Sequence, residues 1–315
     1  MQPLRFANGA ELPRLLPGPM EGVTSGAWLE ILTRHRWVEA WWTPFLRIST
    51  GVPRRSRLAQ WLRPYLATGL PVIAQIMGEN TSRLAETARR LGELGATAID
   101  LNCACPSPVV VGNHAGGERL RHPGWLTETL CAIREAIGNL PLGVKLRVGF
   151  NAPGEFAEAI APAICAAPPD FVTVHFRTVQ ERYNPVPDGL ERLARARRML
   201  PRMYVVGSGD LFAPQDVAAM FEACGVDAVA PARGMLANPR LLADAARLLQ
   251  GGSIAPFSQT EKNALLEEFA ALAPRHFQLQ MAANLYGKNA PEFQAFLRKS
   301  DCQARRDCTR EPNLR

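Results

Sequence analysis

The stretch that decides the fold is VIAQIMGENTSRLAETARRLGELGATAIDLN, residues 72–102. It opens with an apolar run at residues 72–77, continues with helical spacing over residues 81–94, and closes with a second apolar run at residues 98–102. Both runs have the length of a strand, and the first is almost continuously apolar, which is typical of parallel strands covered on both faces. Asn80-Thr81 supplies a start signal for the helix between them. The stretch therefore predicts a strand–helix–strand unit with parallel strands.

The same alternation of short apolar runs and helical spacing occurs eight times along the chain. Strand and helix alternating over about 235 residues is the rhythm of a (β/α)8 TIM barrel, and eight units in one run favour closure over a doubly wound open sheet. The expected strands lie at residues 14–20, 38–48, 72–77, 98–102, 143–148, 171–175, 203–207 and 227–231. The expected helices lie at residues 26–34, 55–66, 81–94, 124–137, 155–165, 190–200, 214–224 and 239–249.

The pattern changes after Gln250. Residues 251–256, GGSIAP, predict a linker. We therefore expect residues 1–250 to form the barrel domain and residues 251–315 to form a small C-terminal all-helical domain with a polar tail from Cys302. The helices expected in this second domain lie at residues 259–273, 275–285 and 290–299.

Composition places the chain among globular proteins. With 315 residues, 47% hydrophobic and 21% charged, it is too apolar for a disordered protein, and no apolar run approaches the roughly 18 residues of a membrane-spanning helix. The formal charge of +7 is carried almost entirely by arginine, which is compatible with a polyanionic partner. Seven cysteines, an odd count, argue against a disulfide framework, and the first residues lack the apolar segment of a signal peptide. We expect a cytoplasmic protein.

Chemically useful side chains follow several expected strands, at the edge where barrel active sites lie. Gln75 lies in the third strand, Asn102 and Cys105 follow the fourth, Lys145 lies in the fifth and His175 ends the sixth. The turns after the last two strands, at residues 207–210 and 232–234, are where such barrels often bind a phosphate. Each residue alone has an ordinary explanation, such as a packed cysteine or a hydrogen-bonded core histidine. Their convergence on one mouth describes a flavin mononucleotide (FMN) site.

Four motifs make the pattern more specific. They are PMEGVT at residues 19–24, DLNCACP at 100–106, VKLR at 144–147 and HFRT at 175–178. Together they resemble the tRNA-dihydrouridine synthases, and the first resembles the C-type members, which act on uridine 16. The resemblance covers about residues 14–245 and implies an FMN-containing barrel with a helical tRNA-binding domain. It also implies an NADPH-dependent reduction of the uridine C5=C6 bond to 5,6-dihydrouridine in tRNA.

The resemblance implies roles for individual residues. Cys105 matches the acid that protonates C5 of the uracil while reduced FMN gives a hydride to C6, and a thiol is a suitable neutral acid. Asn102 and Arg177 match substrate contacts. The chain departs from the family pattern at Phe176, Ser208 and Ala232, where the family usually has glycine, asparagine and glycine. The expected cofactor contacts are Pro19, Met20, Gln75, Lys145, His175, Ser208, Gly209, Asp210, Ala232 and Arg233.

Arginines and tryptophans are interleaved between residues 34 and 63, a composition suited to phosphate contact and base stacking. We expect Trp41 or Trp42 to lie in the core and a second basic run, at residues 192–202, to form a solvated helix face. The arginines expected to contact RNA are Arg54, Arg55 and Arg57, within a series that also holds Arg34, Arg36, Arg47 and Arg63, with Trp37, Trp41, Trp42 and Trp61 between them.

Two other functions stay open at this point. One is an FMN-dependent reductase of a free pyrimidine or another small enone-like substrate, and the other is a degenerate barrel that binds RNA. The expected partner is tRNA, with no membrane association, no metal site and a monomeric chain. No separate nucleotide-binding fold is visible in the sequence, so NADPH is expected to use the flavin face.

Overall fold

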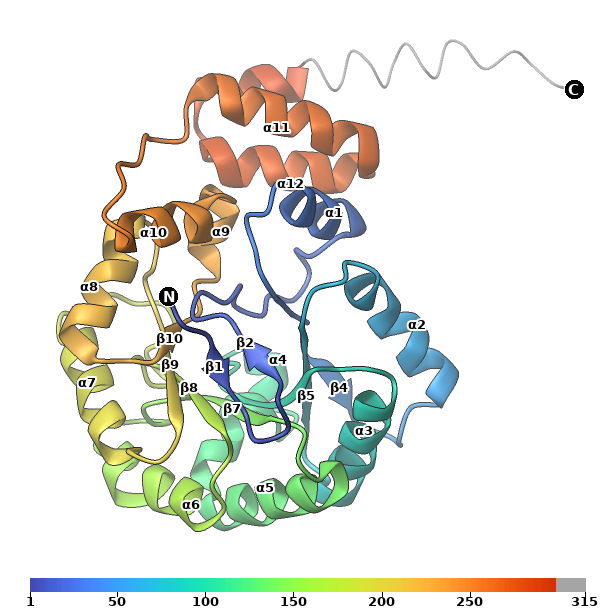
Figure 1. Cartoon of the computed structure of the whole chain (residues 1–315), viewed down its shortest axis with the longest axis vertical. Helices are drawn as coiled ribbons and strands as arrows, with labels where there is room; N and C mark the ends of the chain where they lie inside the picture. Colours follow the sequence, from blue (N-terminus) through green and yellow to red (C-terminus); the bar gives the residue numbers. More distant parts are fainter. Residues whose placement is uncertain (299–315) are drawn as a thin grey trace, which may run out of the picture.

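The computed structural model describes residues 1–298 and has a curved parallel sheet surrounded by helices (Figure 1). Neighbouring strands follow the order β10-β9-β8-β7-β6-β5-β3, with β4 also paired to β5. This is the strand order of the predicted barrel. The strands are β3 (Trp41–Trp42), β4 (Leu46–Ile48), β5 (Val72–Gly78), β6 (Ala98–Cys103), β7 (Leu142–Arg147), β8 (Phe171–His175), β9 (Tyr204–Ser208) and β10 (Ala228–Val229).

The first expected strand, residues 14–20, is an extended segment that pairs in parallel with β10 through Leu15 and Val229. The Val229 N–H donates to the Arg14 carbonyl at 2.9 Å, and the Leu16 N–H donates to the Val229 carbonyl at 3.0 Å. Leu16 also belongs to the buried cluster that contains Trp42 of β3. The segment therefore continues the sheet beyond β10, as expected of the first strand.

The second expected strand, residues 38–48, is divided into β3 and β4. Pro44 lies at the break, where its missing N–H cannot join the ladder. The Thr43 N–H still donates to the Ile73 carbonyl at 2.9 Å, and the Thr43 hydroxyl accepts the Gln75 N–H at 2.9 Å. A side chain therefore continues the pairing with β5 across the break.

Helices cover the outer face of the sheet (Figure 1). The helix expected at residues 155–165 begins instead with a π-helical turn, η2 (Phe156–Ile160), because Pro162 cannot donate to a carbonyl in the preceding turn. The barrel helices are α1 (Gly26–Arg34), α2 (Arg55–Leu66), α3 (Thr81–Glu93), α5 (Pro123–Ile137), α6 (Ala161–Ala166), α7 (Gly189–Met199), α8 (Pro214–Cys224), α9 (Arg233–Ala237) and α10 (Leu241–Leu249).

Alternation along each strand separates an outer apolar layer from the barrel interior. On β6, Ile99, Leu101 and Cys103 join the cluster that packs under the helices. The amino-terminal end of the interior is filled by a second cluster that includes Trp42 and Phe171. An unpredicted antiparallel hairpin, β1 (Leu4–Arg5) and β2 (Glu11–Leu12), adds its leucines to this cluster and lies over that end of the strands (Figure 1).

The carboxyl-terminal segment is helical as expected, with α11 (Gln259–Leu272), α12 (Arg275–Tyr286) and helical residues 291–298. These helices lie beside α1, α9 and α10 (Figure 1). Phe269, Met281 and Leu285 are buried in the same cluster as the barrel helices, and Arg34 pairs with Glu268 at 2.8 Å. The helical segment is thus fixed on the barrel by a shared core. The polar tail predicted from Cys302 lies outside the described residues.

None of the helices in residues 1–298 is both long enough and apolar enough to cross a membrane.

Gly143 of β7 tests the interior packing. A Cβ at this position would lie 2.2 Å from the Phe171 ring, so we expect Gly143→Ala to lower the free energy of unfolding by about 1–3 kcal/mol through overpacking. Gly124→Ala in α5 is the matched control, because a Cβ there meets nothing within 4 Å. Urea unfolding of both variants measures the difference, and equal midpoints would contradict this description of the interior.

Candidate active site

A cavity of about 350 Å³ opens at the carboxyl ends of the barrel strands. Its volume lies within the ~300–1,000 Å³ typical of small-molecule sites. Strand ends that are far apart in the sequence contribute to one wall. The predicted residues that line it are Pro19, Met20, Asn102, Cys105, Lys145, His175, Ser208, Gly209, Asp210, Ala232 and Arg233.

Gln75 is the predicted cofactor contact that lies beneath this wall, fully buried in the barrel. Its Nε2 donates to Asp100 Oδ2 at 2.7 Å, and its Oε1 accepts from Asn102 Nδ2 at 2.8 Å. Asn102 Oδ1 in turn accepts the backbone N–H groups of Ala104 at 3.0 Å and of Cys105 at 3.2 Å. A continuous chain of hydrogen bonds therefore joins the buried carboxyl group of Asp100 to the backbone of Cys105.

The two cysteines of this motif lie in different environments. An extended strand would place residues two positions apart on the same face, but β6 ends at Cys103 and Cys105 lies in the loop that follows. Cys105 lines the cavity and packs beside Met77, Val110 and Ala115. Burial raises the pKa of the Cys105 thiol, which keeps it protonated at neutral pH and suits it to donate a proton. Cys103 is fully buried on the opposite side, among the residues under the helices.

The loop after Cys105 closes tightly over it. It contains the short helix α4 (Pro108–Val111) and the 3-10 helix η1 (Gly116–Arg121), neither of which was predicted. The Gly117 N–H donates to the Cys105 carbonyl at 3.0 Å, and a Cβ at Gly116 would lie 3.0 Å from Cys105 Cβ. Gly116 also has φ +59, a conformation that glycine adopts without strain. These contacts fix the loop against the thiol.

The cavity is rich in cationic groups. Burial, with added repulsion from Arg147, lowers the pKa of Lys145 to about 8. Burial and the neighbouring cations hold the pKa of His175 well below its usual value, so its imidazole is neutral. His175 Nδ1 lies 3.2 Å from the Arg177 N–H and accepts it, which places the ring proton on Nε2 as a donor. This set of groups suits an anionic ligand that carries carbonyl oxygens.

Arg177 does not line the cavity, and its predicted contact with substrate stays a prediction. Only 1% of Arg177 is exposed. Its Nη1 donates to Asp210 Oδ1 at 2.9 Å, and its Nε donates to the Asn184 carbonyl. Arg233 Nη2 also donates to Asp210 Oδ1, at 3.1 Å. Asp210 therefore holds two arginines at the corner between β9 and β10, beside the start of the short helix α9.

Phe176 stands outside the cavity, although it replaces a glycine of the family pattern. A Cβ at Gly209 would lie 2.4 Å from the Phe176 ring, and one at Gly189 would lie 2.8 Å from it. The ring thus occupies the space that these two glycines leave open. Phe176 packs into the outer cluster and does not narrow the cavity.

The arginines expected to contact RNA lie on the outer surface. Arg54, Arg55 and Arg57 are exposed at the start of α2, outside the cavity. Arg55 pairs with Glu93 at 2.7 Å. The expectation that Trp41 or Trp42 lies in the core is confirmed for both, each 2% exposed. Neither is available to stack on a base.

The second basic run has an ordinary structural explanation. On α7, Arg192 pairs with Glu181 at 2.8 Å and with Asp188 at 2.9 Å. Arg195 pairs with Glu191 on the same helix at 3.4 Å. Most of the charge on this helix face is therefore balanced by neighbouring carboxylates.

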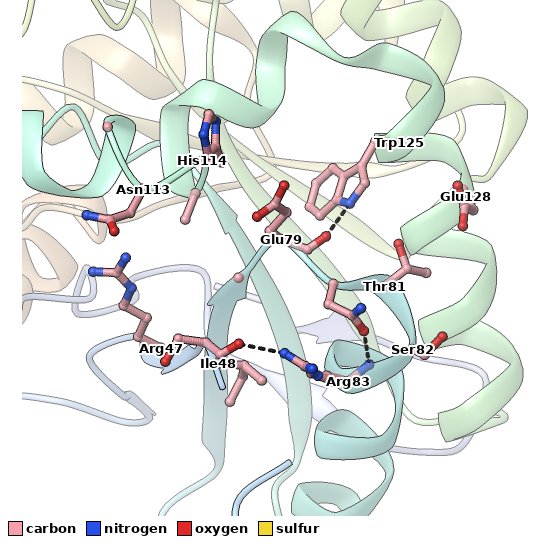
Figure 2. Close-up of a pocket in the computed structure, with 15 residues that line it drawn as sticks. Arg47, Ile48, Glu79, Thr81, Ser82, Arg83, Asn113, His114, Trp125 and Glu128 are labelled. Atoms are coloured by element: carbon pink, nitrogen blue, oxygen red, sulfur yellow. Dashed lines mark hydrogen bonds between the residues drawn. The ribbon is translucent and has the colours of Figure 1, made fainter. Parts of the chain in front are cut away.

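A second cavity, of about 670 Å³, lies behind the loop that follows Cys105. It is formed by the end of β4, the start of α3, residues 112–115 and α5 (Figure 2). The Trp125 indole N–H donates to the Glu79 carbonyl at 2.7 Å, and Arg83 Nη1 donates to the Ser49 carbonyl at 2.7 Å (Figure 2). Sequence reasoning missed this cavity, because its walls come from segments that no motif connects.

Sequence reasoning also omitted several residues of the first cavity from its site. One of them, Arg147, could have been found from strand alternation, since it follows Lys145 by two positions and faces the same side. Its Nε donates to the Ala104 carbonyl at 2.9 Å, beside Cys105. The others are Glu21, Val23, Phe45, Ala104, Pro106, Tyr183, Leu211, Phe212, Pro231, Gly234 and Leu236.

Solved structures share the fold at low sequence identity. A 2-naphthoyl-CoA reductase complex aligns with a TM-score of 0.60 and 13% identity over 80% of this chain and 52% of that chain. Morphinone reductase in complex with tetrahydroNAD aligns with a TM-score of 0.55 and 14% identity over 82% and 93%. At these identities the likeness shows the barrel architecture alone.

Sequence comparisons are more specific. The chain is 30% identical over 301 residues to the tRNA-dihydrouridine(16) synthase of Pseudomonas putida, a match that covers 90% of this chain and 92% of that protein. It is 32% identical over 234 residues to the protein of the same name from Escherichia coli, covering 72% and 74%. A family model described as dihydrouridine synthase (Dus) matches residues 16–299, barrel and helical segment together. The chain therefore belongs to the dihydrouridine synthase family.

Proposed function

We propose that this chain reduces the C5=C6 bond of a uridine in tRNA to 5,6-dihydrouridine, with FMN as its cofactor and NADPH as the reductant. The family supports the reaction, and the names of its relatives support tRNA and uridine 16 as the substrate. The observation that carries the proposal is the protonated thiol of Cys105 in a cationic cavity at the carboxyl edge of the barrel.

The residues present fit FMN. Lys145 and His175 Nε2 are donors for the carbonyl edge of the flavin ring, and Arg233 and the backbone of Gly209 can hold its phosphate. The Asp210 carboxylate would repel a phosphate, but Arg177 and Arg233 neutralise it. When bound and reduced, FMN supplies the hydride for C6 of the uracil. NADPH reaches the same face of the cavity in this proposal.

Cys105 supplies the proton for C5. Protonation of carbon needs an acid that is neutral until the moment of transfer, and burial keeps the thiol in that form. Lys145 and His175 would stabilise negative charge on a bound flavin ring, because they offer donors in a site shielded from water. Arg147 holds the Ala104 carbonyl next to the thiol and so keeps the start of the loop in place.

In this proposal the exposed arginines around α2 and the helical segment bind the RNA. Arg47, Arg54 and Arg57 are exposed along β4 and the start of α2, where they can bind phosphates. Residues 1–250 act as the catalytic domain and residues 251–315 as the tRNA-binding domain in this proposal. The chain works as a monomer in the cytoplasm.

Replacement of Cys105 separates the two halves of the reaction. Cys105→Ala is expected to keep NADPH-driven bleaching of the flavin but to lower dihydrouridine formation by about 100-fold or more, because the proton donor is lost. Cys103→Ala is the matched control and is expected to leave product formation intact. Mass spectrometry of tRNA from a dihydrouridine-deficient host that carries each variant gives the result. Normal dihydrouridine with Cys105→Ala would show that the proton comes from another group.

Affinity for FMN is expected to fall as the pH rises from 7.5 to 9.5. The ammonium of Lys145 is present below its pKa of about 8 and is lost above it, so the dissociation constant should rise by about tenfold. This range lies above the pKa of Asp100, which burial raises to about 7. Flavin fluorescence titrations measure the effect. Lys145→Met should bind more weakly at pH 7.5 and lose the dependence, and an unchanged dependence would assign it to another group.

Binding of tRNA is expected to depend on the arginines at the start of α2. Changing Arg54, Arg55 and Arg57 together to Ala should weaken binding and reduce the slope of log affinity against log salt by about 2–3, with flavin content unchanged. The control removes the same charge from the opposite region, with Arg195, Arg198 and Arg202 changed to Ala. Filter binding at several salt concentrations compares them, and equal losses would indicate a general charge effect.

A further inference from the structure

We propose that Asp100 is a positioning residue, which acts through Gln75 and Asn102 to hold the backbone of Cys105 and to make the Asn102 amide present only an N–H donor to the cavity. The inference rests on the proposed function in one respect, because it takes Cys105 as the proton donor. The hydrogen bonds themselves are properties of the chain alone.

Asp100 sets the direction of the whole chain of hydrogen bonds. At pH 8, above the pKa of about 7 to which burial raises it, the Asp100 carboxylate is ionised and can only accept. Gln75 therefore turns its NH2 group toward Asp100 Oδ2 at 2.7 Å. The Gln75 carbonyl oxygen then faces Asn102 and accepts its Nδ2–H at 2.8 Å. Turning either amide around would place two donors or two acceptors opposite each other. The orientation of both side chains therefore follows from one buried group.

The far end of this chain is the backbone at Cys105. Asn102 Oδ1 accepts the N–H groups of Ala104 and Cys105 at 3.0 and 3.2 Å, which uses both lone pairs of that oxygen. The strand has ended at Cys103, so no sheet neighbour holds these two N–H groups. Asn102 replaces the missing strand partner and fixes the position from which the thiol side chain leaves.

The same pattern decides what the Asn102 amide can offer to a ligand. With its oxygen fully used, Asn102 has only its second N–H left. Asn102 lines the cavity. An N–H donor at this position favours a carbonyl oxygen over an amino group, because a facing amino group would leave two N–H donors opposite each other and unpaired. Flavin and uracil rings both carry carbonyl oxygens.

The burial of Asp100 indicates that packing alone does not explain why an acidic residue occupies this position. The residue is fully buried, and its Oδ1 has no hydrogen-bond partner within the part of the chain that the structure describes. A carboxylate in such a place is costly: burial raises the pKa of Asp100 to about 7, and the hydrogen bond from Gln75 and the nearby charge of Lys145 only partly oppose that rise. Thr173 lies on β8 in the barrel, is equally buried, and has a hydroxyl that is also without a partner among the described residues. It offers a matched control outside the hydrogen-bond chain.

The test measures how fast iodoacetamide alkylates Cys105 at pH 8 in the full chain without FMN or tRNA, by tandem mass spectrometry that distinguishes Cys105 from Cys103. Asp100→Leu removes the acceptor, so Cys105 should react about fivefold faster as its backbone loosens. Asp100→Asn keeps an oxygen that accepts from Gln75 and should stay within about twofold of the parent, as should Thr173→Val. FMN titration of the same variants should show the same order.

Two results would overturn the proposal. Asp100→Leu could behave like Thr173→Val, or Asp100→Asn could react as fast as Asp100→Leu, which would make charge rather than hydrogen bonding decisive. If Asp100→Leu does not fold, Gln75→Met breaks the chain at its middle with little change in volume and should give the same acceleration; a parental rate would contradict the proposal. Alkylation needs neither cofactor nor tRNA, so failure of the proposed function would leave this result standing.

Discussion

The alternation of side chains along β6 is the constraint on which the rest of the molecule depends. Asp100 and Asn102 face the barrel interior because Ile99, Leu101 and Cys103 face the helices. A shift of one residue in the pairing with β5 or β7 would reverse both sets and place two polar side chains under the helices. The apolar face of one strand therefore determines where the hydrogen-bond chain below the cavity begins, and the end of that strand determines where the thiol lies.

Two carboxyl groups, those of Asp210 and Asp100, lie beside the positively charged side chains at the mouth and in the interior of the barrel. Asp210 neutralises Arg177 and shares Arg233, while Asp100 lies near Lys145 in the interior. Three cationic side chains, Lys145, Arg147 and Arg233, nevertheless line the cavity, against two acidic ones, Glu21 and Asp210. The site thus keeps an excess of positive charge for an anionic ligand, but each buried guanidinium has its own acceptors and does not rely on that ligand for its hydrogen bonds.

Much of this site could be predicted because parallel strands bring their carboxyl ends to one edge. That rule placed Lys145, His175 and Asn102 together without any knowledge of side-chain contacts. The rule could not show that Gln75 lies deeper in the barrel than the residues that line the cavity, or that Arg177 is paired with Asp210. Both depend on how far each strand extends. Pro44 could be identified as the point where the second strand divides only once the pairing with β5 was known. The hairpin at the amino terminus was missed because its two short strands lack a periodic signal, and the second cavity because its walls come from four separate segments.

The shared core of the barrel and the helical segment couples the stability of the two parts. Phe269, Met281 and Leu285 pack into the same cluster as α1 and the barrel helices, and Arg240 in the loop before α10 bonds to the Ala255 carbonyl in the connecting segment at 2.9 Å. Within residues 1–298 the helical segment is therefore not an independent folding unit, because its buried face is completed by the barrel helices. A substitution such as Leu285→Ala, which leaves a cavity in this cluster, should lower the stability of both parts together.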